Sequence, residues 1–341
     1  MTRNERLRPA FLVALLSAVL VALCLLSIAL GARSIPLDQV VRALFGQPGS
    51  ELIENVIWSV RVPRTALGLT AGAALGLSGA LMQALTRNPL ADPGLLGVSA
   101  GASFAIVLSV VVLGLGSLFQ YIWFALAGAL VASILVFLLG RLGRSGLTPV
   151  KLALAGVAVS SLLYSLTNAV VLTNPEALNR YRFWAAGSLA DQSGDVVLQV
   201  LPFVAVGAAL ALACAPALNS LALGDDVAAS LGQRLGLIRL QGVIAITLLT
   251  GAAVTVIGPV VFIGLVVPHL ARILVQRVGL GPDHRWLLPL SAVLAPCMLL
   301  AADIVGRVIE RPLEIQAGIL VALIGGPFFI AMVRRRRLAE V

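Results

Sequence analysis

Two apolar runs separated by a short polar link decide the fold of this chain: TALGLTAGAALGLSGALMQA at residues 65–84 and GLLGVSAGASFAIVLSVVVL at residues 94–113. Neither run contains a charged residue, and each is long enough to cross a bilayer as a helix, which takes about 20 residues. The link holds Asn88-Pro89 and Asp92-Pro93, and proline ends or breaks a helix. The sequence therefore predicts two separate membrane spans here.

Similar runs recur along the whole chain, which has 341 residues, 60% of them hydrophobic and 11% charged. A soluble domain would carry about 25% charged residues. Hydropathy predicts an all-α polytopic membrane protein with about ten transmembrane helices in one transmembrane domain, residues 1–341. The first run is long for a signal peptide and is expected to be retained. The expected spans are 10–30, 65–84, 94–113, 120–140, 152–172, 196–217, 240–259, 261–277, 287–305 and 314–333.

The basic residues set the expected orientation. With the N-terminus in the cytoplasm, 16 of the 24 Lys and Arg residues fall on the inner side, including the Arg334–Arg337 run. Insertion favours positive charge inside, so both termini are predicted to be cytoplasmic. Arg61, Arg64, Arg307 and Arg311 then lie against this tendency, at the outer edge.

Two connections look structured. On the outer side, residues 36–45 have apolar residues at helical spacing and predict an amphipathic helix lying on the membrane surface. On the inner side, Pro216 is expected to close a span, and residues 219–236 predict two short helices. Gly224 marks a break, and Asp225 and Asp226 follow it, where a helix N-terminus favours acids.

A short internal match suggests an inverted repeat. Gly72-Ala73-Ala74 precedes Gly79, and Gly251-Ala252-Ala253 precedes Gly258 at the same spacing, in spans that run in opposite directions. Inverted repeats are typical of transporters, whereas ordinary small-residue packing between helices explains the match equally well. Breaks in the spans are expected at the Asn88–Pro93 link, at Gly258-Pro259 and at Pro268-His269.

Other function classes find little support. The net charge of +9 is spread over short connections, without the aromatic-interleaved basic patch of a nucleic-acid-binding protein. The three cysteines lie singly in apolar runs, so neither a disulfide nor a metal site is expected. The chain has no phosphate-binding G-x-x-x-x-G-K-[ST] loop, so ATP would have to be hydrolysed by another polypeptide, and no cofactor is expected.

Several long motifs resemble the permeases of ABC importers for iron siderophores, haem and cobalamin. They are the run from Arg61 to Arg64, the run from Gly72 to Gln83, and the stretches Arg87–Gly97, Gly258–Arg272, Ala302–Arg307 and Gly325–Phe328. The resemblance covers essentially the whole chain and implies the type II importer fold. The stretches Ser99–Ile106, Arg182–Leu189 and Asp283–Trp286 are most similar to permeases of ferric enterobactin importers.

The resemblance implies a permease that moves a ferric siderophore, of the catecholate type, across the bacterial inner membrane. It implies as partners a second related permease, two ATPase subunits and a substrate-binding protein that is periplasmic or lipid-anchored. A haem or cobalamin cargo is the alternative, and an ion-coupled secondary transporter is a third reading that inverted repeats and broken helices would also fit. Co-purification with an ATPase separates the importer from the secondary transporter.

The resemblance also assigns site residues. It implies that Arg61, Arg64 and Arg307 dock the binding protein through its carboxylates; lipid anchoring or pairing with Glu51, Glu54 or Glu310 is the structural alternative. It implies a coupling surface for the ATPase within residues 219–236, which an ordinary loop would also explain. The coupling residues are Leu223, Gly224, Asp225, Asp226, Ala229, Ser230, Leu231 and Gly232.

The remaining polar residues within the spans have two readings each. Gln83, Thr167 and Asn168 are candidates for the translocation pathway, but each could hydrogen-bond a neighbouring helix instead. Asp303 is costly at its depth and is expected to be functional or paired with an arginine. His269 is expected to pack between helices and His284 to be solvated.

Overall fold

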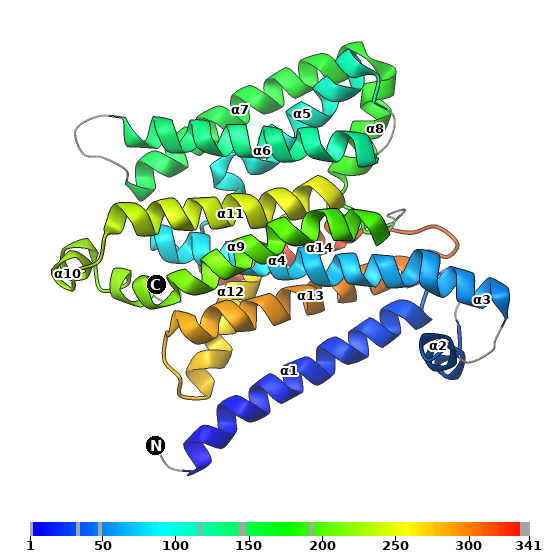
Figure 1. The fold of residues 1–341 in the computed structure, drawn as a ribbon, viewed down its shortest axis with the longest axis horizontal. Coiled ribbons are helices and arrows are strands. Elements are labelled where there is room, and N and C mark those ends of the chain that lie inside the picture. The colour runs from blue at the N-terminus through cyan, green and yellow to red at the C-terminus, as the bar shows by residue number, and fades with distance from the viewer. Residues whose placement is uncertain are drawn as a thin grey trace.

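A computed structural model of the chain describes residues 3–31, 35–46, 50–115, 118–142, 148–190 and 194–334. Within these ranges every regular element is a helix, and the long helices run side by side in a bundle (Figure 1). The elements are α1 (Arg3–Ala29), α2 (Leu37–Leu44), α3 (Glu51–Val56), a π-helical turn (Ile57–Arg61), α4 (Val62–Thr86), a 3₁₀ turn (Pro93–Leu96), α5 (Val98–Leu113), α6 (Leu118–Arg141), α7 (Pro149–Thr173), α8 (Pro175–Ala185), α9 (Gly194–Leu221), α10 (Asp225–Ser230), α11 (Leu235–Ile257), α12 (Ile263–Arg277), α13 (His284–Ile309) and α14 (Ala317–Arg334).

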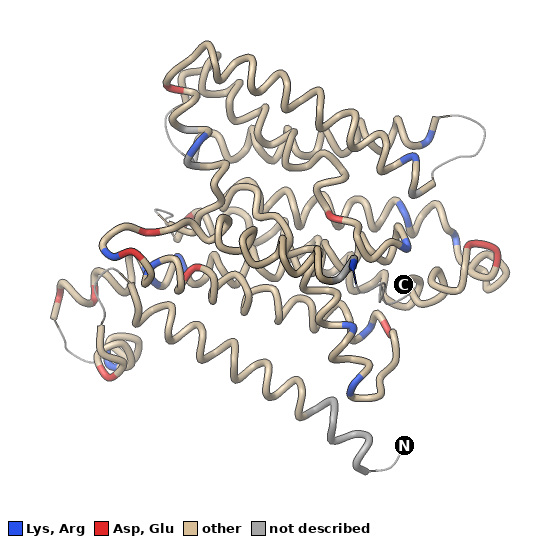
Figure 2. The backbone as a smooth tube through the Cα atoms, turned by 180° about the vertical axis from the view of Figure 1, so that it is seen from behind, with Lys and Arg blue, Asp and Glu red and all other residues tan. Residues whose placement is uncertain are grey.

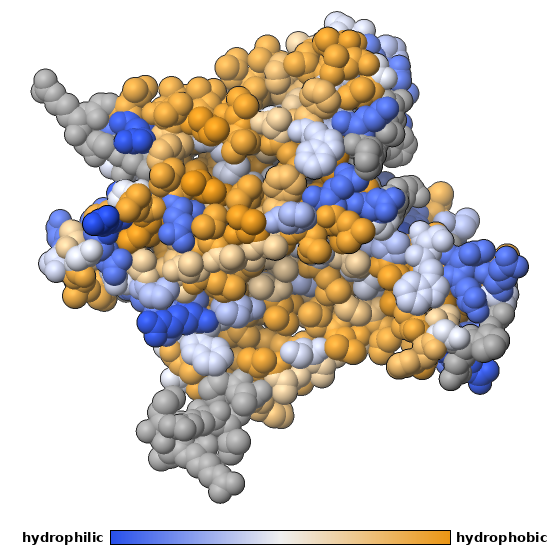
Figure 3. All heavy atoms as spheres, viewed as in Figure 1, coloured by the Kyte–Doolittle hydropathy of each residue, from blue (hydrophilic) through white to orange (hydrophobic). Residues whose placement is uncertain are grey.

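The bundle has the dimensions and surface of a membrane domain. Among the described residues, seven helices are long and apolar enough to span a bilayer, and α5 and α14 contain shorter apolar helices. Most charged residues lie toward the two ends of the bundle (Figure 2), and apolar residues cover most of the surface between them (Figure 3). One end holds α10, and the other holds α2, α3 and α8. These are called here the α10 end and the α2 end.

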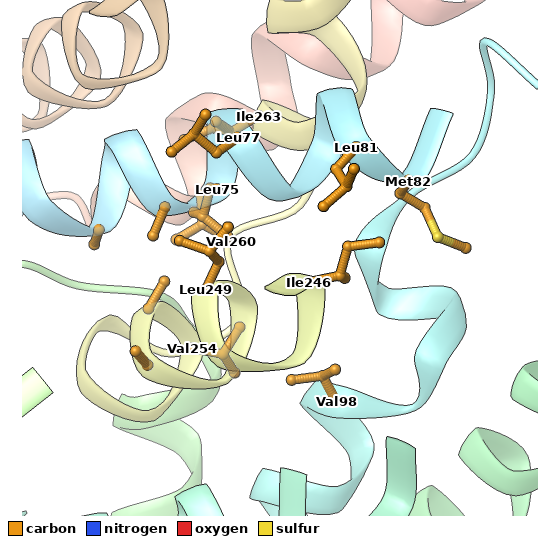
Figure 4. Close-up of a cluster of buried hydrophobic side chains, with 14 of the residues drawn as sticks. Leu75, Leu77, Leu81, Met82, Val98, Ile246, Leu249, Val254, Val260 and Ile263 are labelled. Atoms are coloured by element: carbon orange, nitrogen blue, oxygen red, sulfur yellow. The ribbon is translucent and has the colours of Figure 1, made fainter. Parts of the chain in front are cut away.

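Helices α4 and α11 form the centre of the bundle. In each, 78% of the most apolar window is buried, against 17% in α1 and 22% in α7. The largest core cluster is built around this pair: Leu75, Leu81 and Met82 of α4 meet Ile246 and Leu249 of α11 (Figure 4). A helix that is apolar all round and buried all round is a core helix. Helices α1 and α7 lie at the periphery and leave apolar side chains exposed.

Glycines allow α4 to approach its neighbours closely. A methyl group at Gly72 would lie 2.6 Å from Cα of Pro296 in α13, and one at Gly79 would overlap the backbone of Gly264 in α12. Small residues at such crossings bring helix backbones into direct contact, which stabilises helix pairs in a membrane. The glycine spacing of this segment therefore serves helix packing at both crossings.

The break between α11 and α12 is satisfied from within the protein. The break starts at Gly258, whose φ is +77°, and the groups around it pair with the end of α8 and the segment that follows it. Ser188 N donates to Ile257 O at 2.8 Å, and the indole of Trp184 donates to Thr255 O at 3.2 Å. Irregular backbone persists at membrane depth only with such partners, as expected at Gly258-Pro259.

Three local predictions were wrong. Pro268 lies within α12 and does not interrupt it, and Pro216 lies within α9, which continues to Leu221. A membrane helix tolerates proline because neighbouring helices satisfy the freed carbonyl groups. Residues 219–236 form one short helix, α10, and not two, because α9 and α11 extend into both ends of the segment.

Helices α2 and α3 form a small structure beside α1 at the α2 end. Helix α2 falls within the predicted range 36–45, and its buried residues are Val40 and Ala43. They pack with Ile28, Ile35 and Ile57 in a cluster separate from the main core. Leu37, Val41 and Phe45 remain exposed on the other side of the helix. Helix α2 thus has an apolar surface toward the protein and another toward its surroundings.

Candidate functional site

The arginines predicted to dock a partner belong to a buried charge cluster at the α2 end. Arg64 reaches both carboxylate oxygens of Asp303, with Nη2 at 2.7 Å, and its Nη1 lies 2.7 Å from Glu314. Arg307, one turn after Asp303 in α13, places Nη2 at 2.9 Å from the same carboxylate. Asp303 and Arg307 are 1% and 2% exposed. Such buried charges need both pairing and further hydrogen bonds.

The same cluster binds the last carbonyl groups of α1. A helix leaves its last four carbonyls without partners in the helix and concentrates partial negative charge there. Arg61 Nη1 donates to the carbonyls of Ile28 and Ala29 at 2.6 and 2.7 Å. Arg307 Nη1 donates to the carbonyls of Ser27 and Leu30 at 2.8 and 2.7 Å. Two arginines from α13 and the start of α4 therefore hold the end of a peripheral helix.

These contacts limit how the arginines could serve a partner. Asp303 is paired with arginines, as one of its two readings expected. Arg64 binds Asp303 and Glu314, and Arg307 binds Asp303. All three guanidinium groups are buried and donate to groups of this chain. Sequence reasoning missed Glu314, because no helical spacing relates it to Arg64. Docking through these arginines stays a prediction.

At the α10 end, Asp225 connects three elements. Its two carboxylate oxygens lie 2.9 Å from Arg87 Nη2, just past α4, and 2.7 Å from Arg239 Nη2 in the first turns of α11. Arg87 has the left-handed conformation, with a φ of +48°, which turns the chain at the end of α4. Asp226 is exposed. The two neighbouring acids therefore have different environments, and Asp225 fixes α10 to the bundle.

The surface around α10 is apolar and exposed. Leu223, Val227 and Leu231 follow one another at four-residue spacing and are 64%, 43% and 59% exposed. Val227 lies within α10, whereas Leu223 precedes Gly224 and Leu231 directly follows the helix. Ala229, Ser230 and Gly232 are exposed beside them. Exposed apolar clusters of this kind mark sites that bind another molecule, and Val227 extends the predicted set.

The pathway candidate Gln83 is part of the helix packing. It is fully buried and its amide nitrogen donates to the carbonyls of Gly264 and Leu265 at 3.3 and 3.2 Å. Its amide oxygen accepts from Arg272 Nη2 of α12. Gln83 thus holds α4 to the first turn of α12, one turn beyond the contact between Gly79 and Gly264. This is the alternative role given above, a hydrogen bond to a neighbouring helix.

The other two pathway candidates, on α7, lie on different sides of the helix. Thr167 is buried, and its hydroxyl donates to Leu163 O at 2.8 Å. Asn168 is exposed, and so are Ser161 and Ser165. These three share one face, at spacings of four and three residues. The exposed side of α7 therefore carries a polar stripe, within which Ser165 Oγ donates to Ser161 O at 2.8 Å.

The histidines serve the structure. Contrary to the prediction of a solvated residue, His284 is 4% exposed at the first turn of α13. Its Nδ1 lies 2.8 Å from Asn219 Oδ1, and Asn219 Nδ2 donates to Asp283 at 2.6 Å. Burial raises the pKa of Asp283, but hydrogen bonds from Arg285 N and Asn219 outweigh it and lower the pKa below its ordinary value. His269 packs beside Phe328. No group of three metal-ligating side chains occurs among the described residues.

Helices that are long and apolar enough to cross a membrane, with a break whose backbone groups are satisfied within the protein, are typical of multi-pass transport proteins. Comparisons with known proteins agree. The model of the FecCD transport family matches residues 19–335. The chain is 48% identical to the ferric enterobactin transport system permease protein FepD of Escherichia coli K12, over 91% of each chain. It is 36% identical to the hemin transport system permease protein HmuU of Yersinia pestis, over 98% of each chain.

Solved structures agree as well. The chain matches an inward-facing metal-chelate type ABC transporter with a TM-score of 0.81 and 28% identity, covering 94% of this chain and 97% of the other. The chain belongs to the FecCD transport family, the permeases of ABC importers for iron siderophores, haem and cobalamin. It is a multi-pass translocation subunit of the cytoplasmic membrane and not an enzyme, and an ATPase and a binding protein complete such an importer.

Proposed function

We propose that the chain is the permease through which a ferric siderophore of the catecholate type crosses the cytoplasmic membrane. The observation that carries this proposal is the 48% identity to a ferric enterobactin permease, sustained over nearly the whole chain. Haem is the second candidate cargo, supported by the lower identity to a hemin permease, and cobalamin remains the third. Related permeases carry different cargoes on one fold, so the cargo requires a transport measurement.

Ten crossings account best for the packing, eight of them arranged as two inverted halves and two, α1 and α9, outside these halves. The seven long helices would be joined by α5, α12 and α14, which are shorter. One half would consist of α4 to α7 and the other of α11 to α14. Helix α4, which begins the first half, packs on α12 and α13 of the second; α11, which begins the second, packs on α5 and α6 of the first. The two halves therefore make equivalent helix contacts, which supports an inverted repeat in addition to the glycine match in α4 and α11. The α10 end would be cytoplasmic, as the positive-inside tendency favours.

The exposed surface of α10 would bind the ATPase subunit. The predicted coupling residues Leu223 and Leu231 flank α10 and are exposed, while Asp225 holds the helix to α4 and α11. A surface that is fixed to two central helices would transmit a displacement to both of them. Asp225 is then a positioning residue, and Leu223, Val227 and Leu231 supply the contact.

Changing Leu231 to Asp should therefore prevent the ATPase from co-purifying with the permease. A charge in the centre of an apolar contact must be desolvated without a partner, and a loss of affinity of at least about tenfold is expected. The control is Leu313→Asp, the same substitution at a leucine that is 66% exposed in the loop between α13 and α14 at the opposite end of the bundle. Undiminished co-purification of the ATPase with the Leu231→Asp permease would exclude this surface. If no ATPase co-purified even with the natural permease, the importer assignment itself would fail, and a secondary transporter would remain.

The binding protein would dock at the opposite end, where Arg61, Arg64 and Arg307 are located. Because these side chains are engaged within the chain, we propose that they act indirectly. Arg64 holds Glu314, and Ile315 N donates to Gly306 O at 3.0 Å, so the cluster fixes the loop between α13 and α14. Exposed Glu310 and Arg311 in that loop would meet the partner. The complete importer would contain a second, related permease and two ATPase subunits.

The exposed stripe of α7 would line the translocation pathway. Ser161, Ser165 and Asn168 are uncharged; Asn168 can donate hydrogen bonds, whereas the hydroxyl of Ser165 already donates to Ser161 O at 2.8 Å and offers an acceptor. A siderophore chelate is rich in oxygen acceptors, and a hydrogen-bonding wall without fixed charge would let it pass without holding it. A related permease would supply the opposite wall, since one peripheral helix cannot enclose a pathway. Gln83 and Thr167 are engaged elsewhere and have no part in this wall.

A further inference from the structure

A cavity of about 320 Å³ lies at the α2 end, between α2, α3 and the π-helical turn that precedes α4. It is more than ten times larger than two other cavities of this chain, which measure about 20 and 30 Å³. It is also remote in sequence from the α7 stripe and from α10. Its walls are Ile35, Pro36, Gln39, Leu52, Ile53, Val56 and Arg61.

The lining of this cavity is chiefly apolar. Of the seven residues, Gln39 and Arg61 are polar, and Arg61 directs Nη1 to two carbonyls of α1. A volume of about 300 Å³ or more is in the range of small-molecule sites. Water does not fill an apolar cavity stably, because it finds too few hydrogen-bond partners there. The cavity is therefore suited to an apolar occupant.

The surface around the cavity carries exposed apolar side chains. Leu37, Val41 and Phe45 of α2 are exposed next to it, and Phe45 is 80% exposed. Trp58 and Val60 are exposed on the segment that leads from α3 into α4. Exposed apolar residues of an amphipathic helix together with a tryptophan are typical of the boundary between headgroups and acyl chains. The apolar molecules present there at high concentration are phospholipids.

We propose that this cavity binds one acyl chain of a phospholipid, so that a single lipid is held between α2, α3 and the π-helical turn. This lipid site requires only that the permease lies in a membrane, and it does not depend on which cargo is transported. Leu52 is suited to the entrance, since it lines the cavity and is also 59% exposed. The bound chain would complete the small apolar cluster of Ile35, Val40 and Ile57, which lies apart from the main core.

The test counts phospholipids that remain bound to the full-length permease. The permease is reconstituted with phosphatidylethanolamine, extracted, washed with excess detergent and analysed by native mass spectrometry. We expect one retained phospholipid per chain in the natural protein. Ile53→Trp, which fills the cavity, should lower its occupancy by about tenfold or more, because excluding even two methylenes of the acyl chain has that effect. Val60→Trp places the same side chain on the exposed surface outside the cavity and should retain the lipid.

Leu52→Trp provides an independent variant, because its exposed side chain allows substitution without disturbing the fold, and it should also release the lipid. Loss of the lipid in both cavity variants but not in Val60→Trp would establish the site. The proposal is overturned if the washed natural protein retains no phospholipid, or if the cavity variants retain as much as the natural protein.

Discussion

Replacing Arg307 with Met should destabilise the permease by about 3–5 kcal/mol, the usual cost of removing one partner from a buried ion pair. The change removes one of the two arginines bound to Asp303, a carboxylate that is 1% exposed. It also leaves the carbonyls of Ser27 and Leu30 without their donor. Methionine keeps much of the length of the side chain, so the loss reflects charge and hydrogen bonds more than volume.

The measurement is the melting temperature of the purified permease in detergent, together with the yield of monodisperse protein. Arg311→Met is the matched control, since Arg311 is one turn further along and exposed, and it should melt close to the natural protein. Arg307→Lys should recover little, because an ammonium group does not reproduce the planar fork that reaches Asp303 and α1 together. Equal melting temperatures for Arg307→Met and Arg311→Met would show that the cluster does not hold the bundle together.

Gly79→Val should prevent the central helices from packing. The first side-chain carbon would overlap the backbone of Gly264 where α4 meets α12. Overpacking costs about 1–3 kcal/mol when neighbouring side chains can shift, and here the obstacle is backbone, so the helices themselves must separate. The separation would also break the hydrogen bonds from Gln83 to Gly264 and Leu265. We expect little or no monodisperse permease from this variant.

Gly236→Val tests whether the effect belongs to the crossing. Gly236 lies in the first turn of α11, and a side-chain carbon added there meets no atom within 4 Å in the chain. Its yield after extraction in detergent should approach that of the natural protein. A normal yield and melting temperature for Gly79→Val would mean that α4 and α12 do not approach each other as closely as the structure shows.

The fold could be predicted from the sequence to a large extent because membranes impose simple requirements. Runs such as 65–84 and 196–217 need about 20 apolar residues to cross, and both lie within helices of the structure. The breaks at Asn88–Pro93 and Gly258 were also visible, since proline and glycine stop helices that lack a continuing partner. Pro216 and Pro268 were wrongly expected to end or interrupt a helix. Neighbouring helices satisfy the carbonyl groups that a proline frees, and a local sequence pattern does not show those neighbours.

The functional residues were harder to predict, since their roles depend on contacts far apart in sequence. Arg64 pairs with carboxylates 239 and 250 positions away, and nothing near Arg64 indicates that it is buried. Asp225 and Asp226 are adjacent and equivalent in sequence, yet only Asp225 meets both Arg87 and Arg239. On α7, by contrast, the polar stripe follows helical spacing and could have been found by continuing from Asn168 to Ser165 and Ser161.

The central claim is tested most directly by uptake of radiolabelled cargo in cells that lack this permease and receive it back on a plasmid. We predict that the natural permease restores uptake of a ferric catecholate siderophore and not of haem or cobalamin. Leu231→Asp should abolish the restored uptake, and Asn168→Leu should reduce it while the ATPase still co-purifies. Restored uptake of haem or cobalamin instead would keep the permease and reject the siderophore, and full catecholate uptake by the Leu231→Asp variant would contradict an ATP-driven importer coupled through α10.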